Sequence, residues 1–241
     1  MRALVFHQSQ ESSNVIFEEK PVKEVPDGYA RVKVLAASLN HRDEWIRNGF
    51  YKLGDNYIMG SDVACGTVEE VKDEKYDNLV GKQVIIYPYL EWENDAHSSR
   101  HVLKILGGPD DGTFCEKIVV PAKNLMEKPD HLTPEQAATL PIAGLTSYQA
   151  LIVRGGLKVG ETVLITGSGG GCGLFLIQFA KAFGAKGVLY TEVDWSDKLK
   201  QIVPEEHGGF FDMIIDSSGG RFVSTYLDLL KSSGRYVFFG Q

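Results

Sequence analysis

Residues 164–173 read LITGSGGGCG, and residues 174–181 continue as LFLIQFAK. The apolar run Thr162–Thr166 predicts a buried strand and Cys172–Phe183 predicts an apolar helix, so glycines fill the turn between them. Glycine permits positive φ and close approach to the backbone, while a helix N-terminus offers N–H groups and a partial positive charge. This strand–turn–helix context predicts a nucleotide pyrophosphate site, with an ordinary flexible loop as the alternative.

The glycine spacing departs from the strictest form of such a motif. Gly167, Gly170 and Gly173 recur at every third position, and Ser168 stands where the Gly-x-Gly-x-x-Gly pattern has its first glycine. We expect Gly173 to let the helix pack tightly on the strand. The residues of the turn expected to bind the nucleotide are Gly167, Ser168, Gly170, Gly171, Cys172 and Gly173. For Cys172 the alternative is a small apolar residue of the helix.

The chain after this turn alternates between strands and helices, which predicts a parallel sheet covered on both faces. Ligands of such sheets bind at the carboxyl ends of the strands, so we expect Ser217, Phe239 and Gly240 to face the cofactor. The further expected elements are strand Val188–Thr191, helix Ser196–Val203, strand Asp212–Asp216, helix Phe222–Leu230 and strand Arg235–Phe239.

The chain before the turn has a different pattern. Eight of the nine prolines precede residue 142, and short strand-like runs separated by turns predict a β-rich unit. A short helix is expected near Asp43, and Thr133–Gln136 forms a capping box that begins another helix. We therefore expect an α/β protein with two domains, 1–122 and 123–241. The expected strands of the first are Ala3–Phe6, Val15–Glu18, Arg31–Leu35, Val63–Val71, Gln83–Tyr87 and Glu116–Val120.

Composition limits the classes of function. With 241 residues, 43% of them hydrophobic, the chain can bury a sizeable core, and its net charge of −7 disfavours nucleic acid as a partner. Cys65, Cys115 and Cys172 have no paired spacing, which disfavours a disulfide framework and fits a reducing compartment. With no signal peptide or long apolar run, we expect a cytoplasmic protein that acts on a small molecule without a membrane partner; a homo-oligomer is left open.

Three further motifs accompany the glycine turn. Residues 39–43 read LNHRD, residues 60–64 read GSDVA and residues 143–148 read AGLTSY. In this order they resemble the medium-chain dehydrogenase/reductase superfamily, and within it the zinc-free, quinone-oxidoreductase-like branch, over nearly the whole chain. The resemblance implies a GroES-like β-rich domain and a Rossmann domain with the active site in the cleft between them. It also implies hydride transfer from NAD(P)H, usually NADPH, to quinones, enones or other carbonyl compounds.

The resemblance identifies the positions that hold zinc in zinc-dependent members. The matching positions here are Asn40, Ser61 and Ile142, and Arg42 occupies the place of a proton-relay hydroxyl. Zinc prefers thiolate, imidazole and carboxylate ligands, so we expect no zinc. A different metal site could use His97 and His101 with Glu91, Glu93 and Asp95, but a solvated loop is the simpler interpretation of this polar segment.

The resemblance also suggests the catalytic residues. Asn40 is expected to contact substrate or nicotinamide, with loop capping as the alternative, and Thr146 to contact the nicotinamide, with a helix cap as the alternative. Asp43 is expected near the reacting groups, or else as the partner of an arginine. Tyr51 is expected to line the substrate mouth, or else to be a surface tyrosine.

Two strands of a full Rossmann domain are not found. Such a domain has six strands, and we expect four here, because Lys186–Trp195 resembles the third strand and the chain ends after the fifth. The second strand carries the residue that distinguishes NAD from NADP, so NADP is expected from the resemblance alone and NAD is not excluded. An incomplete sequence, a truncated protein or a smaller sheet would each explain the difference. The alternative function is a non-catalytic NAD(P)-binding protein, either a redox sensor or a truncated inactive homologue.

Overall fold

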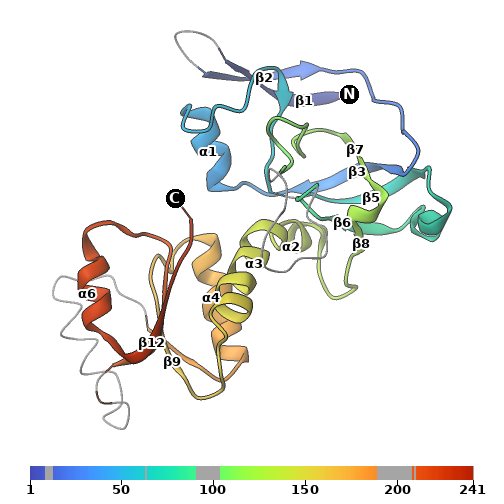
Figure 1. Ribbon diagram of the computed structural model, residues 1–241. Coiled ribbons are helices and arrows are strands. Elements are labelled where there is room, and N and C mark those ends of the chain that lie inside the picture. Colours follow the sequence, from blue (N-terminus) through green and yellow to red (C-terminus); the bar gives the residue numbers. More distant parts are fainter. Residues whose placement is uncertain (9–12, 63, 91–103, 189–207, 209, 241) are drawn as a thin grey trace. The chain divides into compact units, whose positions relative to one another are not determined.

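The structure is a computed structural model that describes residues 1–241 except 9–12, 63, 91–103, 189–207, 209 and 241 (Figure 1). The chain divides into two compact units, Met1–Ile142 and Ala143–Gln241. The elements of the first unit are β1 (Arg2–Gln8), β2 (Ser13–Glu19), β3 (Tyr29–Ala37), α1 (His41–Arg47), β4 (Tyr57–Ile58), β5 (Ala64–Val71), η1 (Glu74–Leu79), β6 (Gln83–Ile86), β7 (Lys117–Pro121), η2 (Ala122–Asn124), β8 (Leu125–Glu127) and α2 (Pro134–Ala138).

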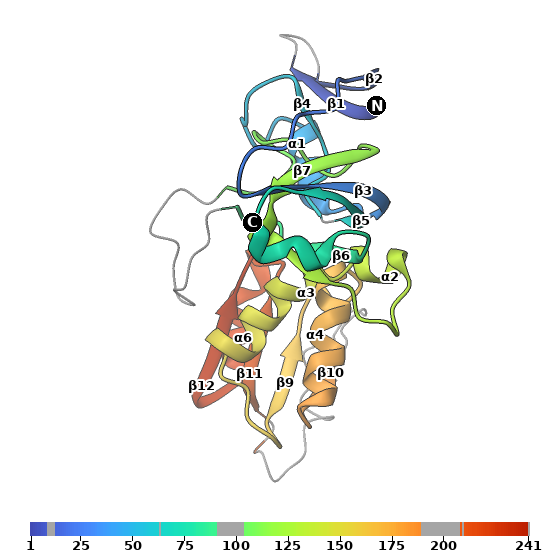
Figure 2. The ribbon, with the colours of Figure 1, turned by 90° about the vertical axis from the view of Figure 1, so that its right-hand side faces the viewer.

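The first unit is β-rich, as expected. A three-stranded sheet has the order β2-β1-β4 and a five-stranded sheet the order β7-β3-β5-β6-β8, and all neighbouring strands are antiparallel (Figure 2). Alternate residues of β3, such as Ala30 and Val32, are fully buried and join Val84 and Ile86 of β6 in the main core. A strand with one buried face needs this alternation because successive side chains point to opposite faces.

The boundary between the units lies after Ile142 rather than after residue 122. Strand β8 pairs with β6, and α2 packs against β3 and β5, with Ala137 and Ala138 buried in the core of the first unit. The expected boundary was too early because these apolar contacts, which the local sequence pattern does not reveal, attach residues 123–142 to the β-rich unit. The capping box of Thr133 and Gln136 at the start of α2 is confirmed.

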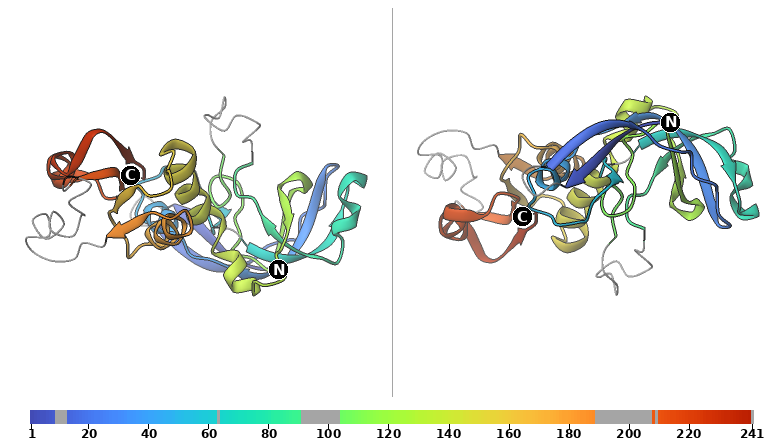
Figure 3. Two further views of the ribbon diagram at one scale, coloured as in Figure 1. Left: turned by 90° about the horizontal axis from the view of Figure 1, so that it is seen from below. Right: turned by 90° about the horizontal axis from the view of Figure 1, so that it is seen from above.

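The second unit contains a four-stranded parallel sheet with the order β10-β9-β11-β12. Strands β9 and β11 are completely buried, as the centre of a sheet covered on both faces requires. Helices α4 and α6 lie on opposite faces of this sheet (Figure 3). Leu176 and Ala180 of α4 belong to the core on one face, and Tyr226 of α6 belongs to the core on the other. The elements are α3 (Pro141–Tyr148, which begins in the first unit), the π-helical turn η3 (Gln149–Arg154), β9 (Thr162–Ile165), α4 (Gly171–Ala182), β10 (Lys186–Val188), β11 (Phe211–Asp216), η5 (Gly220–Phe222), α6 (Val223–Asp228) and β12 (Leu230–Phe238).

Two expectations for this sheet need correction. The strand after α4, Lys186–Val188, pairs directly with β9 and so takes the place of the second strand in the usual order, not of the third. The last strand begins at Leu230 rather than at Arg235, because Leu230 already pairs with Phe211 before a register shift. Accordingly α6 ends at Asp228, earlier than expected.

The expected helix Ser196–Val203 lies outside the described residues. In the described part of the chain, no helix combines the length and the hydropathy that crossing a membrane requires.

Candidate functional site

The glycine turn begins after β9 and ends in the first turn of α4. Gly167 has a φ of 63°, which favours glycine, and a Cβ there would lie 2.4 Å from the Ser217 hydroxyl oxygen. A Cβ on Gly173 would lie 2.4 Å from the carbonyl oxygen of Gly167. The helix therefore approaches the turn only because Gly173 lacks a side chain. Backbone conformation and close packing explain these two glycines.

The three glycines that lie between Gly167 and Gly173 have a different explanation. None of Gly169, Gly170 and Gly171 has a positive φ; a Cβ on Gly169 would meet nothing within 4 Å, and on either of the others nothing nearer than 3.5 Å. Gly170 is the N-cap residue of α4, and no side chain caps this helix start. The protein itself does not require glycine at these positions, so the open backbone suits an anion that approaches the helix N-terminus.

Asp216, the last residue of β11, connects the ends of three strands. Its carboxylate accepts hydrogen bonds from the Thr166 hydroxyl, which follows β9, and from the Tyr236 hydroxyl of β12 at 2.6 Å. The backbone N–H groups of Ser218 and Gly219 donate to the same carboxylate at 2.9 and 3.1 Å. Asp216 is fully buried. The Asp216 carboxylate therefore holds together the carboxyl ends of these strands, beside the glycine turn.

Hydrogen bonding keeps this buried carboxylate ionised. Burial raises the pKa of Asp216, but the hydrogen bonds from Thr166, Tyr236 and Ser218 outweigh burial and leave its pKa below the ordinary value. Burial and the bond to Asp216 both raise the pKa of Tyr236, so the phenol remains a donor.

The expected residues at the ends of β11 and β12 lie beside the glycine turn. The Ser217 N–H donates to the Thr166 hydroxyl at 3.2 Å, and the Phe239 N–H donates to the Asp216 carbonyl at 3.0 Å. A Cβ on Gly240, whose φ is 82°, would lie 3.7 Å from the carbonyl oxygen of Ser217. The structure thus brings Ser217, Phe239 and Gly240 to the same sheet edge, the edge where parallel sheets bind ligands.

Helix α3 packs against the same turn. The Ser147 hydroxyl donates to the Cys172 carbonyl at 2.9 Å, and a Cβ on Gly171 would lie 3.5 Å from the Ala143 Cβ. Half-buried Thr146 precedes Ser147, so it belongs to the helix that borders the glycine turn. Its contact with a nicotinamide stays a prediction.

In the first unit, polar side chains join Asn40, Ser61 and Ile142, the positions that the sequence resemblance matches to zinc ligands. Asn40 caps α1: its side chain accepts from the Arg42 N–H at 2.9 Å, and its own N–H donates to Asp43 at 3.0 Å. The Asn40 amide also donates to Asp62 at 3.1 Å, and the Ile142 N–H donates to the other oxygen of Asp62 at 3.1 Å. Asp62 therefore connects Asn40 with Ile142.

Asp43 and Arg42 meet at Ser61. The buried Asp43 carboxylate accepts from the Ser61 N–H at 2.9 Å and from the Ser61 hydroxyl at 2.8 Å. That hydroxyl accepts from the Arg42 guanidinium at 2.6 Å, so Asp43 is linked to an arginine through a serine rather than by a direct bond. The guanidinium carbon lies 5.8 Å from the ring centre of half-buried Tyr51, which places Tyr51 at this cluster.

The donor set of this cluster does not fit zinc. Asn40, Ser61 and Ile142 offer an amide, a hydroxyl and an aliphatic side chain, and both oxygens of Asp62 already accept hydrogen bonds. No group of three His, Cys, Asp or Glu side chains that could hold a metal occurs within the described residues. The alternative segment from Glu91 to His101 lies outside the described residues.

Sequence reasoning did not single out two residues that organise these regions. Asp216 was available from the sequence, because an acidic residue that ends a strand of apolar neighbours must have its carboxylate satisfied. From the sequence, Arg42 was noted only because it occupies the place of a proton-relay hydroxyl. Its bonds to Ser61 and to the backbone of the distant loop at Gly108 leave no pattern in the neighbouring sequence.

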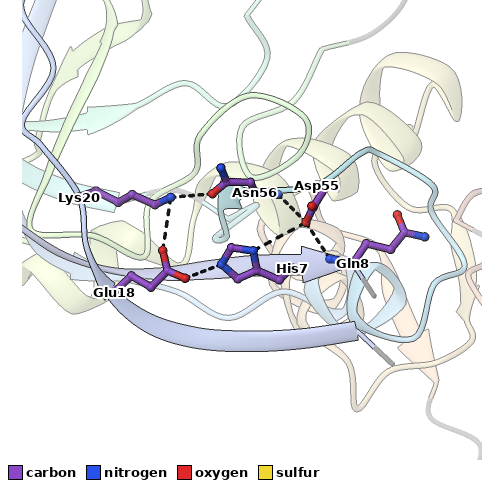
Figure 4. Close-up of polar contacts among 6 residues, drawn as sticks. All are labelled: His7, Gln8, Glu18, Lys20, Asp55 and Asn56. Atoms are coloured by element: carbon purple, nitrogen blue, oxygen red, sulfur yellow. Dashed lines mark hydrogen bonds and ion pairs between the residues drawn. The ribbon is translucent and has the colours of Figure 1, made fainter. Parts of the chain in front are cut away.

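A second polar network in the first unit joins the β1–β2 hairpin to the turn at residues 55–56 (Figure 4). His7 contacts Glu18 through one ring nitrogen and lies 3.8 Å from Asp55 through the other. Lys20 lies 3.4 Å from Glu18 and donates to Asn56 at 2.6 Å. The hydrogen bond to His7 lowers the pKa of Glu18. All these contacts hold one hairpin in place, which is a structural role.

Comparison with known proteins agrees with this fold. The alcohol dehydrogenase GroES-like domain family matches residues 26–130. The zinc-type alcohol dehydrogenase-like protein YogA of Leptosphaeria maculans is 30% identical over 243 residues, which cover 87% of this chain and 67% of that protein. The quinone oxidoreductase of Homo sapiens is 28% identical over 238 residues, covering 89% of this chain and 65% of that protein.

A solved structure resembles both units. The crystal structure of an NAD-dependent alcohol dehydrogenase aligns with a TM-score of 0.86 and 28% identity over 99% of this chain and 77% of that one. The chain spans between about half and two thirds of the length of the first two curated relatives. Its fold and these relatives show that it belongs to the medium-chain dehydrogenase/reductase superfamily.

Proposed function

We propose that this chain is a zinc-independent oxidoreductase that uses NAD(P)H to reduce a quinone, an enone or a similar carbonyl compound. The observation that carries the proposal is the stretch Gly169–Gly171, where neither φ nor packing requires glycine. Close approach of a bound pyrophosphate supplies the missing reason, because a side chain would occupy the space of the phosphates.

The residues at the carboxyl end of the second unit's sheet fit a dinucleotide. The backbone of Gly170 and Gly171 would hold the pyrophosphate at the uncapped start of α4. Ser217 and Gly240 would line the site at the neighbouring strand ends, and Asp216 would hold those ends in place. When bound, the reduced nicotinamide supplies a hydride. NADPH is favoured over NADH on the resemblance alone.

The polar cluster of the first unit would receive the acceptor. One hydrogen of the Asn40 amide goes to Asp62, and the other can donate to a carbonyl oxygen of the acceptor. Asp43 would act as a positioning residue, since its carboxylate holds Ser61 and the backbone of Asn40. Without good zinc ligands at the matching positions, the acceptor must already be electrophilic, as quinones and enones are.

The test uses the purified full chain after dialysis against a chelator. NADPH oxidation is followed by absorbance with a panel of quinones and enones, beside a direct titration of NADPH fluorescence. We expect binding and turnover without added metal. Activity that returns only with stoichiometric zinc would contradict the metal-free mechanism. Tight NADPH binding without turnover on any acceptor would favour a non-catalytic redox sensor.

A further inference from the structure

Arg42 places a half-buried guanidinium in the polar cluster of the first unit. It donates to the Ser61 hydroxyl at 2.6 Å and to the carbonyl oxygens of Leu106 at 3.3 Å, Gly107 at 3.5 Å and Gly108 at 3.0 Å. All four acceptors are neutral. Burial lowers the pKa of Arg42, but an arginine stays charged in proteins, so the cluster contains a cation at any working pH.

Within the described residues, the Arg42 guanidinium has no direct counter-ion. Among the described residues, no carboxylate forms an ion pair with the Arg42 guanidinium, and Asp43 reaches it only through Ser61. A charge withdrawn from water is costly unless an opposite charge or several hydrogen bonds compensate it. By contrast Arg31, in the same unit, pairs with Glu70 at 2.8 Å. The charge of Asp43 raises the pKa of Arg42 but reaches the guanidinium only through Ser61, so a bound anion in direct contact would stabilise the cation further.

One donor of Arg42 remains unused, and one buried hydroxyl packs beside the loop that Arg42 holds. A guanidinium has five N–H groups, and the Nε–H of Arg42 donates to no described residue. The buried Tyr57 hydroxyl has no hydrogen-bond partner among the described residues, and a Cβ on Gly108 would lie 3.0 Å from its ring. Tyr57 thus packs on the loop that Arg42 holds. Burial raises the pKa of Tyr57 to about 12, so its hydroxyl remains a donor.

We propose that Arg42 binds the acceptor's carbonyl oxygen and stabilises the oxyanion that forms there during reduction. This inference rests on the proposed function. It makes Arg42 a catalytic residue that supplies by fixed charge the electrostatic stabilisation that a metal gives elsewhere. It also defines the substrate class: the acceptor carries a carbonyl oxygen that becomes an enolate or a hydroquinone anion.

Reduction of an enone adds one hydride and one proton to its C=C bond. A hydride leaves the reduced nicotinamide, which becomes oxidised, and forms a C–H bond at the β-carbon of the enone. The π electrons between the α- and β-carbons form a new C=C bond between the α-carbon and the carbonyl carbon, and the π electrons of the C=O bond move to oxygen. The enolate oxyanion faces Arg42 until the α-carbon takes a proton from water. The guanidinium gives up no proton at any point.

A phenol is a suitable probe because its anion resembles an enolate. 4-Nitrophenol titrates near neutrality and changes colour when it ionises, so its protonation state can be followed while it is bound. The protein is saturated with NADP+ and titrated with 4-nitrophenol across a pH series. A cation beside the oxygen lowers the pKa of a bound acid by about 1–3, so we expect the phenolate to bind at least roughly tenfold more tightly than the phenol.

Three variants test whether the charge of Arg42 causes the preference for phenolate over phenol. Arg42→Met removes the charge at similar length, Arg42→Lys keeps the charge but not the bonds to the loop, and Arg31→Met is the matched control. We expect Arg42→Met to lose the phenolate preference and to lose about a hundredfold or more in kcat, with NADPH affinity unchanged. Arg42→Lys should keep the phenolate preference in large part, and Arg31→Met should keep both the preference and kcat.

The outcomes separate the inference from the function on which it rests. If the parent protein does not bind NADPH or does not oxidise it, the proposed function fails, whatever the phenolate titration gives. If Arg42→Met still binds phenolate preferentially, Arg42 is not the oxyanion-binding group. Should Arg42→Met fail to fold, Arg42→Lys decides: a folded lysine variant that binds phenol and phenolate equally well would show that loop geometry, and not charge, produces the preference.

Discussion

Replacing Gly170 by valine tests the cofactor site with little expected damage to the fold. The residue has φ −82° and ψ 166°, which suit a β-branched side chain, and a Cβ there would meet nothing nearer than the Gly167 carbonyl oxygen at 3.5 Å. We therefore expect the free energy of unfolding to change by about 1 kcal/mol or less, since valine also restricts the unfolded chain.

Cofactor affinity should fall much more. The valine would occupy the space of the pyrophosphate, and two or more backbone hydrogen bonds to an anion would be lost, each worth about 1.5–3 kcal/mol at most. We expect a net loss of about 2–4 kcal/mol, which is a rise in the NADPH dissociation constant of roughly thirtyfold to a thousandfold. Fluorescence titration with NADPH measures this constant, and thermal unfolding checks the fold.

Gly173→Ala provides the contrast. Its Cβ would lie 2.4 Å from the Gly167 carbonyl oxygen, so this smaller substitution should destabilise the second unit whether or not cofactor is present. An unaltered dissociation constant in a well-folded Gly170→Val protein would refute the reasoning, because the open glycines would then have no ligand to explain them.

Three more expectations follow from the two units. Asp216→Asn should lower the free energy of unfolding by at least about 2 kcal/mol, since buried donors lose a charged acceptor. Because the pKa of Asp216 is depressed in the folded state, this stabilisation is present above the unfolded pKa and is lost as pH falls through the folded pKa. Acid denaturation of the parent and the variant measures the difference. Alkylation of the native protein should modify half-buried Cys172 and leave Cys65 and Cys115 intact, because burial raises the pKa of both buried thiols. NADP+ should protect Cys172, and peptide mass spectrometry with and without NADP+ measures the extent of alkylation at each cysteine. Removal of metal by a chelator should change neither thermal stability nor NADPH oxidation, and a loss of either that zinc reverses would contradict the donor-set argument.

The sequence by itself determined the local features of both units. The strand and helix on either side of the glycine turn, the strand and helix that follow residue 210, and the capping box at Thr133 depend on residues close together in the chain, so local pattern was enough. The glycine turn was found for the same reason, because it lies between a strand and a helix that are adjacent in sequence. The β-rich character of the first unit likewise followed from short runs and turns.

Tertiary structure decided what depends on distant partners. The place of Lys186–Val188 beside β9 is set by pairing across the sheet, and the boundary after Ile142 by the packing of α2 on β3 and β5. The division of the glycines into two that the fold requires and three left open needs the positions of atoms from other segments. The contacts of Arg42 with residues 106–108 are of the same kind, since more than sixty residues separate the partners. A sequence pattern records local conformational preference, whereas these features arise from contacts that form only when the chain has folded.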